Sequence, residues 1–220
     1  MKRLICLLLC GLTLLSLTGC GAPKTETLDI FAMDTYMSLV AIGDGASDVL
    51  QACSNEINTL EQRLSRTIET SSVAQLNANG SAQLDDDTAA LLQAALRYSA
   101  ETGGAFDVTI APLVELWGIT GDDPRVPAQS EIDALLPLVG SGHVHLEGTA
   151  AALDEGCAID LGGIAKGYAS DKTAELFAES GIFGGFVSLG GNVYVHGVTA
   201  EGQPWNVAIQ DPRNTEAYAC

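Results

Sequence analysis

Basic residues are scarce in this sequence. The 220 residues include 10 Lys and Arg against 28 Asp and Glu, which gives a net charge of −18 at pH 7. A chain this acidic repels polyanions, which argues against nucleic acid as a partner and against attachment to anionic lipid by charge alone. Solubility of an exported domain accounts for most of these charges. A site for an anionic ligand would therefore depend on local main-chain N–H groups, a single lysine or a bound cation.

The cysteine pattern predicts no disulfide framework. Six cysteines stand at positions 6, 10, 20, 53, 157 and 220, and no two of them have Cys-x-x-Cys spacing. Two fall in the N-terminal apolar segment, and an odd number remains after Cys20. We interpret Cys53 and Cys157 as small core residues.

The first 19 residues are typical of a secretory signal. Lys2 and Arg3 precede an apolar stretch over residues 4–17, which is too short to span a bilayer comfortably. Residues 17–20 read Leu-Thr-Gly-Cys, which resembles the lipobox of bacterial lipoproteins. We expect an exported protein that is acylated at Cys20 and anchored to a bacterial membrane, with a tether over residues 20–27. A plain signal peptide, cleaved nearby, is the alternative.

The rest of the chain, residues 28–220, is expected to form one α+β domain. Extended segments are predicted at 28–42, 144–153 and 186–195, and helices at 46–64, from residue 87 to about 102, and at 130–138. Ser47, Asp87 and Ser130 are the expected N-caps. Short turns join most of the strands, which favours a largely antiparallel sheet over a doubly wound one.

Neither a Walker A loop nor a Gly-x-Gly-x-x-Gly fingerprint occurs. Residues 158–171 instead predict a short strand over 158–161, a Gly-Gly turn and a helix that ends at Gly181. The free N–H groups of the helix start and Lys166, one turn in, would form an anion-binding corner. Asp160, at the strand end, would need a donor or a metal if buried. The alternative is an ordinary strand–helix turn with a surface lysine.

The three histidines after the signal peptide give little indication of a function. His143 and His145 are two residues apart and could lie on one face of a strand as a metal pair. No third ligand is evident, so we favour a solvated strand. His196 follows a Gly-Gly-Asn turn and is interpreted as structural.

Several segments together resemble the ApbE family, the FAD:protein FMN transferases. Residues 160–171 read Asp-Leu-Gly-Gly-Ile-Ala-Lys-Gly-Tyr-Ala-Ser-Asp, and residues 103–118 read Gly-Gly-Ala-Phe-Asp-Val-Thr-Ile-Ala-Pro-Leu-Val-Glu-Leu-Trp-Gly. Both are similar to blocks of that family. Residues 33–35, 65–77, 188–197 and 205–212 resemble further blocks, in the same order along the chain.

The resemblance implies an enzyme that transfers FMN from FAD to a Thr or Ser hydroxyl of an exported partner protein, with Mg²⁺ and with release of AMP. The residues that it places against FAD are Met33, Ala105, Phe106, Asp107, Asp160 and Lys166. It makes the main-chain carbonyl of Gly163 one Mg²⁺ ligand. Hydrolysis of FAD to FMN and AMP is an alternative, and so is a non-catalytic, truncated flavin-binding lipoprotein.

The sequence departs from the family pattern at several points. Asp34 replaces a usual Gly, and Thr67 stands where an aromatic residue commonly faces the flavin. The family typically continues for about another hundred residues, which carry a His proposed as the base and an Asp-Ala-x-x-Thr block that supplies the remaining Mg²⁺ ligands. We therefore expect no catalytic base among these 220 residues and low activity of the chain alone. The acceptor motif, an Asp-Gly-x-Thr-type segment, is also absent, so flavinylation of the chain itself is not expected.

Overall fold

The computed structural model describes residues 23–119, 121 and 123–218. The proposed signal peptide and Cys20 lie outside these residues. Within them, no helix has the length and apolarity needed to cross a membrane. The first strand already begins at Thr25, so residues 25–27 of the expected tether belong to the fold, because Thr25 and Thr27 pair with Ile42 and Val40 of the next strand.

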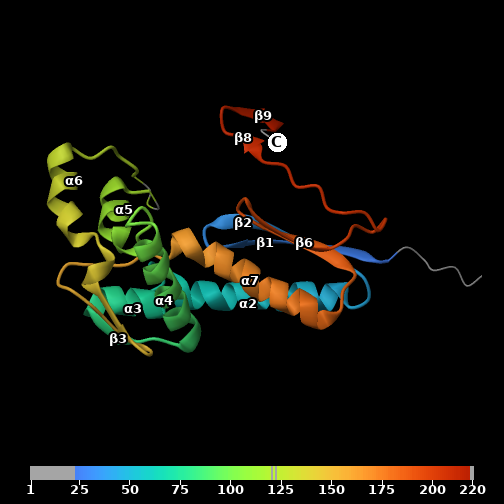
Figure 1. Cartoon of the computed structure of the whole chain (residues 1–220), viewed down its shortest axis with the longest axis horizontal. Helices are drawn as coiled ribbons and strands as arrows, with labels where there is room; N and C mark the ends of the chain where they lie inside the picture. The colour runs from blue at the N-terminus through green and yellow to red at the C-terminus, as the bar shows by residue number, and fades with distance from the viewer. Residues whose placement is uncertain (1–22, 120, 122, 219–220) are drawn as a thin grey trace, which may run out of the picture.

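One side of the molecule is a four-stranded antiparallel sheet covered on one face by two long helices (Figure 1). The strands, in the order in which they pair, are β1 (Thr25–Ala32), β2 (Thr35–Ile42), β6 (Gly184–Leu189) and β7 (Asn192–Gly197). The helices are α2 (Ala46–Leu64) and α7 (Gly162–Ser180). The antiparallel α+β architecture predicted from the turn pattern is confirmed.

The core lies between this sheet and the two helices. Met37, Leu39 and Ala41 alternate along β2 and are buried, as period-two side chains on one sheet face must be. The helix predicted over 46–64 is confirmed, and its apolar side chains at helical spacing are buried: Val49, Leu50, Cys53, Ile57, Leu60 and Leu64. Phe177 of α7 completes the layer and is fully buried.

The other side of the molecule holds shorter elements (Figure 1). A three-stranded antiparallel sheet has the order β3 (Ser81–Gln83), β5 (Ala150–Leu153), β4 (Val144–Glu147). Around it lie α3 (Ser72–Asn79), α4 (Asp86–Glu101), α5 (Ala111–Trp117), α6 (Gln129–Leu135) and the 3-10 turns η1 (Val108–Ile110), η2 (Leu136–Leu138) and η3 (Ser141–His143). The extended structure predicted over 144–153 is confirmed and forms the β4–β5 hairpin.

A last hairpin, β8 (Gln210–Asp211) with β9 (Asn214–Tyr218), follows a long segment without regular structure. Figure 1 shows it on the side of the four-stranded sheet that faces away from α2 and α7.

The three predicted N-caps were each placed on the wrong residue. Gly45 precedes α2, with φ 78°, and its carbonyl accepts from Val49, so Ser47 falls inside the first turn. Asp85 caps α4 by accepting from the Thr88 N–H at 3.0 Å. The Ala128 N–H before α6 donates to the side chain of Glu131 at 2.8 Å. Several polar residues compete near each helix start, and tertiary packing selects among them.

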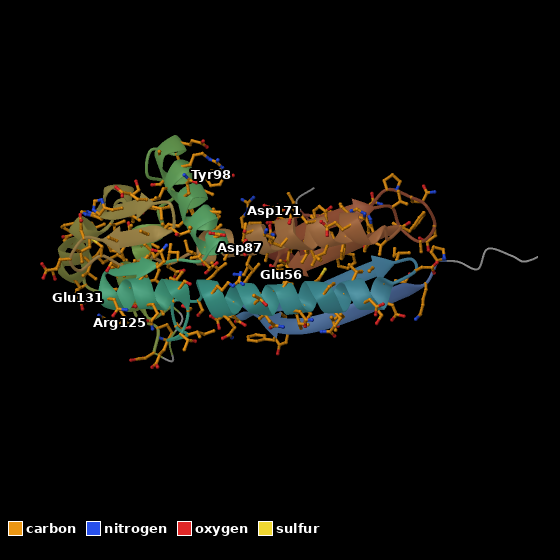
Figure 2. The ribbon with its side chains drawn as sticks, turned by 90° about the horizontal axis from the view of Figure 1, so that it is seen from below. Glu56, Asp87, Tyr98, Arg125, Glu131 and Asp171 are labelled. Carbon is orange, nitrogen blue, oxygen red and sulfur yellow. The ribbon has the colours of Figure 1, made fainter. Side chains whose placement is uncertain are left out.

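Asp87, the residue expected to cap α4, instead joins three helices. It accepts from Arg63 of α2 at 2.8 Å and from the Tyr168 hydroxyl of α7 at 2.7 Å, and Lys172 lies 3.6 Å away. Figure 2 labels Asp87 where α4 meets these helices. Burial and the Asp87 carboxylate raise the pKa of Tyr168 to about 12. The group fixes the start of α4 against the helix that carries Lys166.

Candidate functional site

The segment before α7 belongs to no sheet, so the predicted strand over 158–161 is wrong. Its main-chain groups bond elsewhere. The Ile159 N–H donates to Asn77 Oδ1, and the Ile159 carbonyl accepts from Asn77 Nδ2, both at 2.8 Å. The Asp160 N–H donates to the carbonyl of Val108 at 2.7 Å. These bonds satisfy the buried backbone without a neighbouring strand.

The Asp160 carboxylate is held by two protein donors. Oδ1 accepts from the Gly162 N–H at 2.7 Å, and Oδ2 accepts from Arg66 Nε at 2.9 Å. The side chain is 19% exposed. We expected from the sequence that Asp160, if buried, would need a hydrogen-bond donor or a metal, and the structure supplies two donors. The same contact places a carboxylate on the first N–H of α7, where the helix dipole favours negative charge.

A cleft of about 260 Å³ opens beside this carboxylate. It lies where the β1–β2 turn, the end of α2 and the start of α7 meet. Its lining residues are Met33, Asp34, Glu61, Leu64, Ser65, Arg66, Thr67, Asp160, Gly162, Ala165 and Lys166. Charges of both signs face one small volume, which is an arrangement suited to a ligand with polar and anionic parts.

The β1–β2 turn has two residues with left-handed backbone. Met33 has φ 49° and Asp34 has φ 56°, and the flanking Ala32 and Thr35 pair with each other. A two-residue hairpin with both central φ values positive is a type I′ turn. A β-carbon strains this conformation, while Asp is among the side chains that tolerate it best. The Met33 N–H donates to Glu61 Oε1 at 2.7 Å, which ties the turn to α2.

Lys166 lies in the first turns of α7 and lines the cleft. Among the residues that the structure describes, its ammonium has no hydrogen-bond or ion-pair partner. Its backbone is well held, because Asn192 Nδ2 donates to the Lys166 carbonyl at 3.3 Å and to Ser170 Oγ at 2.7 Å. The helix thus presents a positioned ammonium that is available to a ligand.

The residues expected near FAD divide into two groups. The structure brings Met33, Asp160 and Lys166 together in the cleft lining, but Ala105, Phe106 and Asp107 are not part of it. Ala105 is exposed. Phe106 packs next to the backbone of Gly163, where a β-carbon on that glycine would meet the ring at 3.1 Å.

Asp107 acts as a cap. Oδ1 accepts from the Thr109 N–H at 2.9 Å and from the Thr109 hydroxyl at 2.6 Å, and Oδ2 accepts from Ser99 Oγ at 3.3 Å. The same Thr109 hydroxyl accepts from the Gly140 N–H at 2.7 Å. Asp107 therefore orders the loop in front of α5, beside the Phe106–Gly163 contact.

The histidines lie away from the cleft. His143 Nδ1 and His145 Nε2 both contact the Asp154 carboxylate, at 2.9 and 2.8 Å, and these hydrogen bonds lower the pKa of Asp154. The described residues contain no cluster of three His, Cys, Asp or Glu side chains that could hold a metal. His196 on β7 stacks edge-on against Phe177 of the core, which agrees with the structural role expected for it.

Arg66 is a charged site residue that sequence reasoning missed. It lies two residues after Leu64, the last residue of α2, and reaches Asp160, 94 positions later in the chain. The only sequence signal was its place in the block of residues 65–77, because a lone arginine after a helix is usually solvated. Thr67 also lines the cleft, in the same loop.

Solved structures share this fold. The ApbE protein from Thermotoga maritima is 32% identical, with a TM-score of 0.82, over 87% of this chain and 65% of that one. Flavin transferase ApbE from Vibrio cholerae is 26% identical, with a TM-score of 0.78, over 86% of this chain and 65% of that one. The fold places the chain in the class of α+β proteins that includes these two ApbE structures.

Sequence comparison narrows the class. The FAD:protein FMN transferase of Salmonella typhimurium is 30% identical over 98% of this chain and 68% of its own length, and that of Vibrio cholerae is 30% identical over 91% and 63%. The model of the ApbE family matches residues 33–219. The chain belongs to the ApbE family, and it spans about two thirds of the length of these relatives.

Proposed function

We propose that this protein is an FAD:protein FMN transferase, which moves FMN from FAD to a Thr or Ser hydroxyl of an exported partner and releases AMP. Family membership and the names of the relatives support this class of reaction. The observation in the structure that supports it best is Lys166, an ammonium without an ion-pair partner among the described residues, beside the start of α7.

The cleft can take part of such a substrate. Lys166 supplies a positive charge for a phosphate, and Met33 and Leu64 supply apolar surface. Its volume of about 260 Å³ is near the lower end of small-molecule pockets, roughly 300–1,000 Å³, so these residues enclose a portion of FAD and leave the remainder outside. Phosphoryl transfer depends mainly on positioning and on charge stabilisation. Lys166, together with the start of α7 that Asp160 holds in place, can provide both.

The described residues do not form a Mg²⁺ site by themselves. The carbonyl of Gly163 would supply a single oxygen ligand to the ion. Both carboxylate oxygens of Asp160 already accept hydrogen bonds from protein groups. Mg²⁺ in nucleotide sites usually needs one or two carboxylates together with substrate phosphates. Mg²⁺ dependence therefore stays a part of the proposal that rests on the family, and no step is assigned to the ion here.

The proposal includes export and a lipid anchor at Cys20. Its support is the apolar stretch over residues 4–17 followed by Leu-Thr-Gly-Cys. The variant Cys20→Ala is expected to lose acylation and to be released from membranes or left unprocessed. Labelling with a fatty-acid analogue tests this, and unchanged labelling of the variant would contradict it.

The activity is tested by incubating the exported form of the chain with FAD, Mg²⁺ and a peptide that carries an Asp-Gly-x-Thr-type segment. Covalent FMN on the peptide, detected by its mass, together with AMP, supports the transferase. Free FMN with AMP and no labelled peptide indicates FAD hydrolysis. Failure to bind FAD overturns the proposal. The rate of transfer also tests the expectation of low activity for this chain alone.

A further inference from the structure

Few residues separate the proposed acylation site from the fold. Cys20 would carry the lipid, and the first strand, β1, begins at Thr25. Lys24 is already fixed, because its carbonyl accepts from the Gly43 N–H at 2.8 Å. An extended chain spans at most about 3.6 Å per residue, so the chain from Cys20 to Lys24 can reach roughly 14 Å. The end of the fold that holds Lys24 cannot lie farther than this from the acylated residue.

The residues beside Lys24 form one end of the four-stranded sheet. Gly43 follows β2, and the carbonyl of its neighbour Ile42 accepts from the Phe183 N–H at 2.8 Å. Lys24, Gly43 and Phe183 thus lie on adjacent chains, which in a sheet are about 4.8 Å apart. Figure 1 shows the start of β1 and the end of α7 together, at the opposite end of the molecule from α3 and α6.

Phe183 is a large apolar side chain that this end leaves in solvent. It is 46% exposed, although Ile182 before it is buried. The chain around it is closely packed, since a β-carbon on Gly184 would collide with the Val198 carbonyl and one on Gly197 with the Phe183 carbonyl. A well-placed aromatic ring next to the attachment point can enter the interface of a bilayer, where aromatic side chains are enriched.

Charge does not draw this end to lipid. The exposed carboxylates of Asp44 and Glu179 lie near it, and the whole chain is acidic. Lys24 is an exposed cation at this end, but Glu26 already pairs with it at 2.5 Å. Contact with lipid therefore depends on the short tether and on Phe183, while anionic headgroups repel the acidic flanks of the molecule.

The cleft lies at the other end of the same elements. β1 runs eight residues from Thr25 to Ala32, beside the turn that lines the cleft, and α7 runs nineteen residues from Gly162 at the cleft to Ser180, close to Phe183. At about 3.3 Å per strand residue and about 1.5 Å per helix residue, both lengths are roughly 25 Å. The cleft is therefore about this far from the end that holds Lys24.

We propose that the lipid-anchored protein stands end-on against a phospholipid surface, with Lys24 and Phe183 at the headgroups and the cleft roughly 25 Å above them. The length of the tether sets this contact. The inference rests on the lipid anchor at Cys20 that is part of the proposed function, and not on the transferase chemistry. It implies that an acceptor hydroxyl must be presented at the height of the cleft.

The experiment places the full chain, acylated in a bacterium and checked by its mass, in phosphatidylcholine vesicles. Photoreactive benzoylphenylalanine replaces Phe183 or, as matched controls, Phe31 or Val126, which are 61% and 83% exposed and lie away from this end. After irradiation, mass spectrometry measures the lipid bound at each position, and thermal unfolding checks that each variant is folded. A further form carries about 20 Gly and Ser residues between Pro23 and Lys24, which lengthens the tether by roughly 25 Å.

Position 183 should bind several-fold more lipid than positions 31 and 126, and the long tether should reduce the yield at position 183 by a similar factor. Equal yields at the three positions, or no lipid at position 183, would overturn the end-on contact. An undiminished yield with the long tether would show that the tether does not set the contact, and would overturn the proposal as well.

A water-soluble amine reagent gives a second measurement that leaves Phe183 in place. On vesicles, Lys24 should react several-fold more slowly relative to Lys166 than it does in the long-tether form, because headgroups shield it. An equal ratio in both forms contradicts the proposal. A chain that is not acylated at Cys20 overturns this inference together with the anchor, whereas failure to bind FAD overturns the proposed transferase and leaves the orientation intact.

Discussion

Asn77 and the main chain of Ile159 exchange two hydrogen bonds across 82 positions of sequence, each 2.8 Å long. The side-chain amide takes the place of a neighbouring strand, because it offers one donor and one acceptor at the right spacing. Ile159 directly precedes Asp160, so this pair determines where the Asp160 carboxylate meets Arg66 and the start of α7.

Replacing Asn77 should therefore affect both stability and the site. Asn77→Ala leaves the N–H and carbonyl of the fully buried Ile159 without these partners, which should lower the free energy of unfolding by about 1–3 kcal/mol. FAD affinity should fall with it. Urea unfolding and flavin fluorescence measure the two effects. Asn79→Ala, on the exposed end of α3, is the control, and equal stability of the two variants would contradict the prediction.

Lys166→Ala should weaken FAD binding by about 1.5–3 kcal/mol, since it removes a charge-assisted contact to a phosphate. Riboflavin, which has no phosphate, should bind equally well to the variant. Lys24→Ala is a suitable control, because Lys24 is an exposed residue that pairs with Glu26. Fluorescence titration decides the matter, and identical FAD binding by Lys166→Ala and the unmodified chain would mean that Lys166 is only a surface lysine.

Asp34→Asn should strengthen FAD binding. Asp34 is exposed at the tip of the β1–β2 turn and places a negative charge in the cleft that is proposed to hold a phosphate. Asn tolerates the same left-handed backbone, so the turn should persist. Removing the repulsion is worth about 1 kcal/mol, or roughly fivefold in affinity, at low salt.

The gain from Asp34→Asn should shrink as salt is raised, because exposed charges are screened. Asp44→Asn, which changes an exposed acid in the loop before α2, supplies the control for net charge. An affinity that does not respond to Asp34→Asn at any salt concentration would place the phosphate elsewhere.

The raised pKa of Tyr168 predicts that the folded chain loses stability in alkaline solution. This pKa is raised to about 12 in the folded chain, from the ordinary value of 10.0 for a tyrosine. Between these two values the unfolded state releases the phenolic proton while the folded state keeps it, so the contribution of Tyr168 to stability decreases as pH rises from about 10 to about 12. It is fully present below pH 10.

Tyr168→Phe has no proton to release, so its unfolding free energy should fall less steeply over this range than that of the unmodified chain. At pH 8 it should be less stable, because the hydrogen bond to Asp87 is lost. Urea unfolding at several pH values measures both slopes. Tyr98→Phe, an exposed tyrosine of α4, controls for general alkaline effects, and parallel slopes for Tyr168→Phe and the unmodified chain would refute the argument.

Much of the fold could be predicted from local patterns. Apolar spacing located α2 over its whole length, turns with glycine located the β4–β5 and β6–β7 hairpins, and β1 and β2 were predicted as extended segments within 28–42. These signals succeed because the side-chain period of a helix or strand is a property of its own backbone. The caps of α2, α4 and α6 were each misplaced by two residues, because neighbouring groups compete near a helix start until packing selects where the helix begins.

The sequence by itself determined the acidic character of the chain, its α+β class, the family blocks, and Met33, Asp160 and Lys166 as residues of one site. Only the tertiary structure decided that Arg66 and Asn77 hold Asp160 and its neighbour, that Asp107 caps a turn, and that Phe106 lies against Gly163 outside the cleft. The reason is physical. Periodicity is encoded between neighbours in sequence, whereas the partner of a buried polar group depends on which distant segment packing brings within hydrogen-bonding distance.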